Sequence, residues 1–307
     1  MIQVNDLTRY YGEFPAVQGV SFNVEKGEII GILGLNGAGK STILKILAGL
    51  LVPSGGAVVI DGTDMAKSPD DVRGKIGFLP EDPPLYLDMT VVKFLKHMGK
   101  LKGMSSSQVA ARLPKVLQLT DLVDRQDQVI LTLSHGYRKR VGIAQAIIHD
   151  PKLVILDEPI SGLDPAQIVD MRDVIRGLGK DRAVMISSHI LKEISMTCDR
   201  VIVIHKGKMA SVVEIAEEAG PERFMLTVRA DPSEFEKWVK AHDKVTKFHE
   251  AFLGGGLVTA VIDLTGDERE GFLADVAKAG FGIRLVEPPN AELENIFLGV
   301  IQEEVAT

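Results

Sequence analysis

An octet rich in glycine, from Gly34 to Ser41, constrains the fold of this chain more than any other segment. It reads GLNGAGKS, follows an apolar run typical of a strand (28–33) and precedes a run typical of a helix (42–47). The spacing fits the phosphate-loop pattern. In such a loop, glycines let backbone N–H groups surround phosphate oxygens, and the helix N-terminus adds the positive end of its dipole. The octet therefore predicts a nucleotide phosphate site, whereas the alternative is a glycine-rich turn that binds nothing.

Two side chains of the octet carry its chemistry. Lys40 can reach the β- and γ-phosphates of ATP, and the Ser41 hydroxyl can ligate Mg²⁺. ATP with Mg²⁺ is therefore the expected ligand. The residues of this segment that we expect to contact the nucleotide are Gly34, Asn36, Gly37, Ala38, Gly39, Lys40, Ser41 and Thr42.

A second segment supplies two carboxylates at the end of an apolar run. Residues 153–156 are Leu-Val-Ile-Leu, and Asp157 and Glu158 follow them directly. A buried parallel strand would deliver these acids to the sheet edge at which the phosphate loop opens. Because adjacent strand residues point to opposite sides, their roles should differ. We expect Asp157 to hold Mg²⁺ and Glu158 to accept a proton from the attacking water, and the alternative is a solvated strand end.

Polar residues also follow or precede other predicted elements. His189 comes after the apolar strand pattern 183–187 and can hydrogen-bond the γ-phosphate, although a lone histidine is often structural. Ser134 precedes a predicted helix (138–148), where it can act as an N-cap or, with the helix N–H groups, as an anion site. The three basic residues at 138–140 are typical of a solvated helix face rather than of a nucleic-acid patch.

Composition limits the classes of protein that this chain can belong to. No apolar run approaches the roughly 18 residues of a membrane span, and the N-terminal residues lack a secretion-signal pattern. The single cysteine, Cys198, fits a reducing cytosol and is expected to be a packed residue rather than a reactive thiol. Residues 1–215 have 26 Lys and Arg against 24 Asp and Glu, whereas residues 216–307 have 9 against 18. The acidic second part would repel nucleic acid, so we expect no nucleic-acid partner.

The alternation of strand and helix patterns predicts an α/β fold for residues 1–215. Apolar runs at 57–60, 75–79, 153–156 and 183–187 indicate a mostly parallel sheet covered on both faces. An antiparallel β edge is expected from residues 2–7 and 17–24. A helical subdomain at about 85–150 is expected from two amphipathic patterns, 91–102 and 106–119, for which ordinary surface helices are the alternative.

The sequence pattern of residues 221–307 predicts a separate C-terminal α+β accessory domain. Its patterns follow the order β-α-β-β-α-β, which is typical of a small ferredoxin-like sandwich. The expected strands are 224–229, 246–252, 257–264 and 282–286, and the expected helices are 232–242, 269–279 and 291–303. We find no catalytic cluster in this part.

Taken in order, the segments of residues 2–213 resemble the ATP-binding subunits of ABC transporters. GLNGAGKS is similar to Walker A, LVILDEP to Walker B, LSHGY to the LSGGQ signature and SGLDP to the D-loop, and His189 lies where the family has its switch histidine. The resemblance implies an ATP hydrolase in which Tyr11 stacks on adenine, with Tyr10 as the neighbouring alternative. It also implies that Ser134, Gly136 and Asp164 approach the nucleotide.

Two departures from the family pattern stand out. Glu81 lies where the family usually has a glutamine; it can still ligate Mg²⁺ but cannot donate a hydrogen bond as an amide does. In the signature, His135 and Tyr137 replace glycine and glutamine. These features and the acidic tail, which ends near the LENIF motif (293–297), resemble the ABC-2-type export branch associated with gliding motility and multidrug efflux.

The family resemblance also implies partners. One chain carries one phosphate loop and one signature, and in the family these face different nucleotides, so two copies would form a head-to-tail homodimer. The dimer would act on integral membrane permease subunits from the cytoplasmic face of the membrane. The remaining alternatives are a non-transport ABC ATPase acting on nucleic acid or ribosomes, another phosphate-loop enzyme such as a kinase, and an importer subunit.

Overall fold

The computed structural model describes residues 1–215, 222–253 and 256–287, with the backbone alone for 249–253. The chain divides into two compact units, Met1–Glu214 and Ile215–Thr307. The predicted helix at 291–303 and the LENIF motif lie outside the described residues. Among the described residues, no helix is long and apolar enough to cross a membrane.

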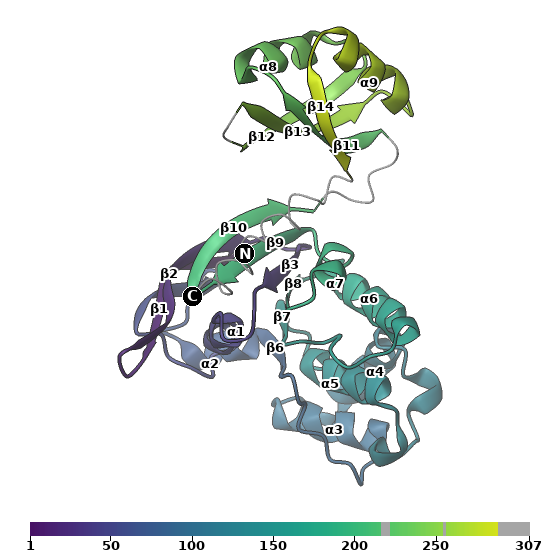
Figure 1. Cartoon of the computed structure of the whole chain (residues 1–307). Coiled ribbons are helices and arrows are strands. Elements are labelled where there is room, and N and C mark those ends of the chain that lie inside the picture. The colour runs from purple at the N-terminus through teal and green to yellow at the C-terminus, as the bar shows by residue number, and fades with distance from the viewer. Residues whose placement is uncertain (216–221, 254–255, 288–307) are drawn as a thin grey trace. The chain divides into compact units, whose positions relative to one another are not determined.

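The first unit is built on a mostly parallel sheet (Figure 1). Its strand order is β10-β9-β3-β8-β7-β6, and all neighbours are parallel except β10 and β9. The strands are β3 (Ile29–Leu33), β6 (Ile76–Leu79), β7 (Leu153–Leu156), β8 (Ala183–Ser188), β9 (Arg200–His205) and β10 (Lys208–Glu214). Every residue of β3 and β7 is buried, as expected for parallel strands covered on both faces.

A separate antiparallel sheet holds the N-terminal strands in the order β2-β1-β4-β5. They are β1 (Ile2–Tyr11), β2 (Phe14–Val24), β4 (Gly55–Ile60) and β5 (Thr63–Asp64). The prediction that the run at 57–60 belongs to the parallel sheet was wrong, because β4 pairs antiparallel with β1. Its burial pattern explains the difference: Val58 and Ile60 are buried whereas Ala57 is exposed, so only one face of this strand is covered.

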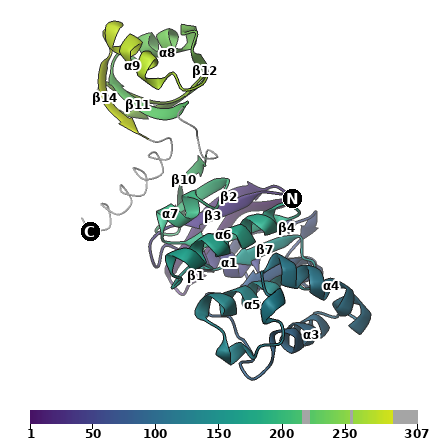
Figure 2. The same ribbon diagram turned by 90° about the vertical axis from the view of Figure 1, so that its right-hand side faces the viewer.

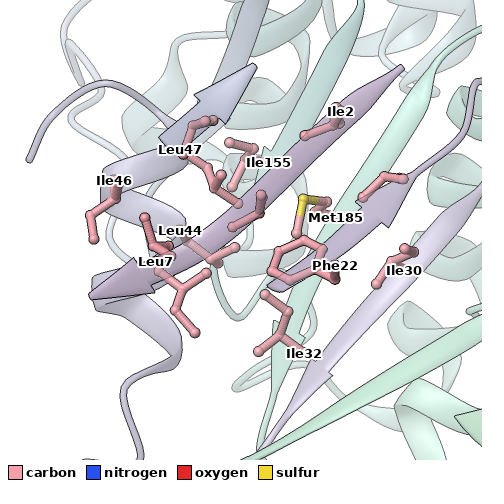
Figure 3. Packing of buried hydrophobic residues seen from close by; sticks show 14 of the residues in the cluster. Ile2, Leu7, Phe22, Ile30, Ile32, Leu44, Ile46, Leu47, Ile155 and Met185 are labelled. Atoms are coloured by element: carbon pink, nitrogen blue, oxygen red, sulfur yellow. The ribbon is translucent and has the colours of Figure 1, made fainter. Parts of the chain in front are cut away.

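The core of the first unit lies between the two sheets and helix α1 (Lys40–Leu47) (Figure 3). Leu44 and Leu47 of α1 pack with Leu7 of the antiparallel sheet and with Ile32 and Ile155 of the parallel sheet. The opposite face of the parallel sheet is covered by α6 (Pro165–Gly179) and α7 (Leu191–Ser195), as Figure 2 shows. A Cβ at Gly31 of β3 would come within 2.7 Å of Ile194 and 3.0 Å of the Cys198 sulfur. Cys198 is therefore a packed residue, and burial raises the pKa of its thiol.

Helices between β6 and β7 form the predicted helical subdomain. They are α3 (Val91–Leu101), α4 (Ser106–Leu119) and α5 (His135–Ile147), with short 3₁₀ turns at Val123–Arg125 and Ile130–Thr132; α2 (Pro69–Gly74) precedes β6. Both α3 and α4 pack on α5. Phe94, Leu95 and Val116 are fully buried, which gives these helices an apolar contact of their own.

The second unit has the predicted β-α-β-β-α-β order. Its elements are β11 (Arg223–Arg229), α8 (Pro232–Ala241), β12 (Val245–Leu253), β13 (Leu257–Leu264), α9 (Arg269–Lys278) and β14 (Gly282–Glu287). The sheet is antiparallel in the order β12-β13-β11-β14. Phe224, Phe235 and Phe272 are fully buried between this sheet and its two helices. This arrangement is a ferredoxin-like sandwich.

Candidate nucleotide-binding site

The phosphate loop joins the end of β3 at Leu33 to the start of α1 at Lys40. Gly37 and Gly39 have φ of 84° and 108°, a backbone region that L side chains rarely adopt. A Cβ at Gly34 would lie 2.4 Å from the Ile204 carbonyl oxygen, and one at Gly39 would lie 2.5 Å from that of Ala16. The loop therefore needs glycine at Gly34 and Gly39 because neighbouring backbone leaves no room for a side chain, and Gly37 is favoured by its φ alone.

Lys40 lies at the centre of the site. Its side chain is buried, and Nζ donates hydrogen bonds to the carbonyl oxygens of Gly34 (2.8 Å) and Leu35 (3.2 Å). The same Nζ is 3.9 Å from Oε1 of Glu158. Burial lowers the pKa of Lys40, and the nearby charges of Glu158 and Asp157 oppose that shift. The ammonium thus lies between the loop and the carboxylates that follow β7.

Asp157 is held by two hydroxyl groups. Ser41 Oγ donates to Asp157 Oδ1 at 3.2 Å, and Ser187 Oγ donates to the same oxygen at 2.6 Å. Among the described residues, no group of three or more His, Cys, Asp or Glu side chains is arranged to hold a metal. The hydroxyl and carboxylate pair of Ser41 and Asp157 nevertheless fits Mg²⁺, which binds through few protein oxygens and takes its other ligands from water and phosphates.

Glu158 and His189 meet beside the loop. The Nδ1 atom of His189 lies 3.1 Å from Oε2 of Glu158, and its side chain is 42% exposed. Glu158 is buried and has φ of 49°, in the left-handed region. Its N–H donates to Ser187 Oγ at 2.9 Å. The predicted base and the predicted γ-phosphate contact are therefore neighbours.

A pocket of about 350 Å³ opens over these groups. Its lining consists of Tyr11, Phe14, Ala16, Asn36, Gly37, Gly39, Lys40, Ser41, Thr42, Glu81, Glu158 and His189. Tyr11 and Phe14 are 47% and 63% exposed, so two aromatic rings are available to stack at one end. Tyr10, which the structure also describes, is outside this lining. Gly34, Ala38 and Asp157 are buried and are not among the residues that line the pocket.

Three predicted nucleotide contacts lie elsewhere. Ser134 caps α5 by accepting the N–H of Tyr137 at 3.4 Å, and Asp164 caps α6 by accepting the N–H of Gln167 at 2.9 Å. A Cβ at Gly136 would come within 2.6 Å of the Gln167 side chain. Although the structure describes Ser134, Gly136 and Asp164, none of them belongs to the lining of the pocket. The phosphate loop and the signature of one chain thus occupy separate places.

Sequence reasoning missed four residues of this region: Phe14, Ala16, Ser187 and Lys139. Phe14 lies three residues after Tyr11, and no pattern in the sequence singled it out. Ser187 ends an apolar strand, so a polar residue at that strand end was the available signal. The prediction of a solvated face at 138–140 was wrong, because Lys139 and Arg140 are only 2% and 4% exposed. Arg140 forms ion pairs with Asp121 and Asp170, and Lys139 donates to main-chain carbonyls near the pocket.

The loop, the carboxylates and the pocket define a phosphate-loop nucleotide-binding protein. Comparisons with known proteins identify the family. The family model described as "ABC transporter" matches residues 17–161. The uncharacterized ABC transporter ATP-binding protein YxlF of Bacillus subtilis is 33% identical over 306 residues, covering 98% of this chain and 99% of its own length.

Two further comparisons cover the first unit. The bacitracin transport ATP-binding protein BcrA of Bacillus licheniformis is 38% identical over 211 residues, which is 68% of each chain. The dimeric post-hydrolysis structure of the ATP-binding cassette MJ0796, bound to ADP and Pi, matches with a TM-score of 0.63 and 25% identity. It covers 71% of this chain and all of that cassette. The chain belongs to the ATP-binding proteins of ABC transporters and is an ABC-type ATPase.

Proposed function

We propose that this chain is the ATPase subunit of an ABC exporter and that two copies bind ATP between them, head to tail. The observation that carries this proposal is the division of the site within one chain. The pocket holds the phosphate loop, Glu158 and His189, whereas Ser134 and Gly136 lie outside it. A second copy that presents Ser134 and Gly136 to the γ-phosphate would complete the site, and the dimeric MJ0796 cassette with ADP and Pi supports this arrangement.

The residues around the pocket suggest a separate chemical role for each side chain. Glu158 would position and deprotonate the attacking water, while Lys40 and His189 would stabilise the charge on the transferred phosphoryl group. Mg²⁺ would neutralise phosphate charge when bound, held by Ser41 and Asp157, with Glu81 lining the same pocket. Tyr11 would stack on adenine and Asp164 would approach the nucleotide from the partner copy.

Closure of such a dimer depends on ATP, since the γ-phosphate bridges the two copies and hydrolysis removes the bridge. ATP therefore has a differential affinity for the closed state, which a molecular switch requires. Transport is supported by the bacitracin transport function in the name of BcrA, and its outward direction by the resemblance to the ABC-2-type export branch.

The helical subdomain and the loop at Glu81 would contact a permease at the cytoplasmic face of a membrane. Tyr86, Leu87 and Leu131 are 45%, 41% and 57% exposed, and the Leu131 N–H donates to the Leu87 carbonyl at 2.9 Å. Exposed apolar side chains that gather in this way mark protein contact sites. Movement of this surface on dimer closure would act on the cytoplasmic helices of the permease.

The test is a substitution that blocks only the shared half of the site. In Ser134→Arg, a bulky cation replaces the helix cap that would face the partner's nucleotide. ATPase activity should be abolished, while a single chain still binds ATP. Unchanged activity would contradict the shared site, and so would a wild-type rate that stays first order in protein at dilutions where only single chains exist.

A further inference from the structure

Helix α5 begins at the signature. Side chains of this helix and of the residue just beyond it form hydrogen bonds with main-chain carbonyls of strand β6. Gln145 Nε2 donates to the Phe78 carbonyl at 3.1 Å, and His149 Nε2, just beyond the helix, lies 3.0 Å from the Ile76 carbonyl. One helical turn before Gln145, a Cβ at Gly142 would come within 2.5 Å of Leu79 and 3.0 Å of Pro83. The helix and the strand are therefore in close contact over their whole common length.

The position of β6 in the sheet explains why its carbonyls are available to α5. β6 is the edge strand and pairs with β7 alone among the described strands. The Leu79 carbonyl accepts the N–H of Asp157 at 2.9 Å, on the side of β7. Because carbonyls alternate in direction along a strand, those of Ile76 and Phe78 point away from β7 and need other donors.

Lys139 continues this row of contacts beyond the end of β6. Its Nζ donates to the Glu81 carbonyl at 2.5 Å and to the Glu158 carbonyl at 3.3 Å. The side chain is 2% exposed, and the negative charges of Asp82, Glu81, Glu158 and Asp157 all act on it. A buried ammonium at this point thus joins the signature helix to the segments of Glu81 and Glu158, two residues that line the pocket.

The hydrogen bond from Lys139 to Glu158 involves a residue with an unusual backbone conformation. Glu158 has φ of 49°, a conformation that a residue other than glycine keeps only when its surroundings impose it. Its N–H is fixed by Ser187 Oγ, and its carbonyl accepts from Lys139 and from the Ser161 N–H at 3.3 Å. The two sides of this residue are therefore held by different elements, and Lys139 is the contribution of α5.

We propose that Lys139 is a positioning residue for hydrolysis: from the helix that carries Ser134, its ammonium fixes the main chain of Glu158 and of Glu81. The nucleotide in a chain's own pocket is thereby linked to the signature that the same chain presents to its partner. This inference rests on the proposed function, because it assumes that Glu158 acts on ATP shared by two copies.

The experiment compares Lys139→Met with Lys139→Arg and with Gln145→Leu as the matched control. Gln145→Leu also removes an α5 donor to a β6 carbonyl, but that donor does not reach Glu158. Lys139→Met should lower kcat about 10²-fold, the loss that a misplacement of about 1 Å can cause, with KM for ATP unchanged. Lys139→Arg, which keeps a cation, should restore most of kcat, and Gln145→Leu should lower the melting temperature without lowering kcat.

A double variant separates positioning from a general loss of structure. If Lys139 acts through Glu158, adding Lys139→Met to Glu158→Gln should slow the residual hydrolysis no further. Equal kcat for Lys139→Met and wild type, or independent multiplicative losses in the double variant, would overturn the inference. Should Lys139→Met melt below the assay temperature, Lys139→Gln replaces it, and the inference then requires a low kcat that Lys139→Arg does not share.

The same preparations distinguish this failure from failure of the proposed function. If the wild-type rate of ATP hydrolysis is second order in protein concentration and Lys139→Met is fully active, the role of Lys139 is refuted and the shared site stands. A wild-type rate that stays first order in protein at dilutions where only single chains exist would contradict the shared site, on which the inference depends.

Discussion

The Ser187 hydroxyl donates a 2.6 Å hydrogen bond to Asp157 and accepts the N–H of the next residue, Glu158, at 2.9 Å. One side chain at the end of β8 therefore fixes both acids at the end of β7. Asp157 is directed toward Ser41, whereas the Glu158 carboxylate is directed toward His189 and Lys40. This separation gives the two adjacent acids different surroundings, as the different roles that we propose for them in metal binding and proton transfer require.

Replacing Glu158 by glutamine should slow turnover strongly without preventing ATP binding. The amide keeps the size of the side chain and cannot take a proton from water, so we expect a loss of about 10²–10⁴-fold in kcat. With hydrolysis blocked, ATP should shift the variant to a dimer on a sizing column. Hydrolysis at the wild-type rate would show that Glu158 is not the base.

Removing the ring of Tyr11 should weaken nucleotide binding. Stacking of a base on an aromatic side chain contributes about 1–3 kcal/mol, so the Kd for ATP should rise by about 5- to 150-fold in Tyr11→Ala. Fluorescence titration with a labelled ATP analogue measures the change. The control is Tyr10→Ala, whose ring is equally exposed but lies outside the pocket lining, and equal losses in both variants would reject the assignment of Tyr11.

Alanine at Gly39 should disrupt the phosphate loop. Its φ of 108° and the Ala16 carbonyl, 2.5 Å from the position of a Cβ, both oppose a side chain. A left-handed conformation alone costs an alanine about 1–2 kcal/mol, so we expect at least about a fivefold loss in ATP affinity. Gly177→Ala in α6, where a Cβ has nothing within 4 Å, should leave ATP binding unchanged. Normal binding by Gly39→Ala would mean that the loop adjusts at little cost.

The first unit should lose stability when the pH falls below the pKa of an ordinary histidine. Burial lowers the pKa of His149 from 6.5 to about 4. Between these values the unfolded chain binds a proton that the folded chain does not, so the free energy of unfolding decreases with falling pH, by up to about 1.4 kcal/mol per pH unit. The stability that the neutral His149 contributes is fully present above pH 6.5. It is lost progressively as the pH falls from 6.5 to about 4, and below about 4 the loss caused by this residue increases no further.

Melting temperatures measured from pH 7 to pH 4.5 test this expectation. In His149→Gln the amide can still donate to the Ile76 carbonyl but does not titrate, so the melting temperature of the variant should change less with pH. The same slope in both proteins would assign the pH dependence to other groups.

Local patterns of sequence predicted the parts of the site that depend on backbone geometry. The phosphate loop, the acids after β7 and His189 each follow an apolar strand, and parallel strands bring their carboxyl ends to one edge. The predictions that failed concern partners distant in sequence. The run at 57–60 is apolar enough for either sheet, and only its pairing with β1 decides between them.

The burial of Lys139 is a second case of this kind. In the sequence it stands between two arginines, a composition typical of a solvated helix face. Its environment is set by the Glu81 and Glu158 carbonyls, which lie 58 and 19 residues away along the chain. A periodic pattern shows which side of a helix is apolar, but it does not show which carbonyls need a donor.

The contacts between α5 and β6 have a consequence for solubility. An edge strand with free carbonyls is a template on which another chain can add a strand and begin an aggregate. Here Gln145 and His149 contact the outward carbonyls of Phe78 and Ile76, and Gly142 brings the helix against the strand, so these two carbonyls are already bonded within the chain and are not available to a strand of another molecule.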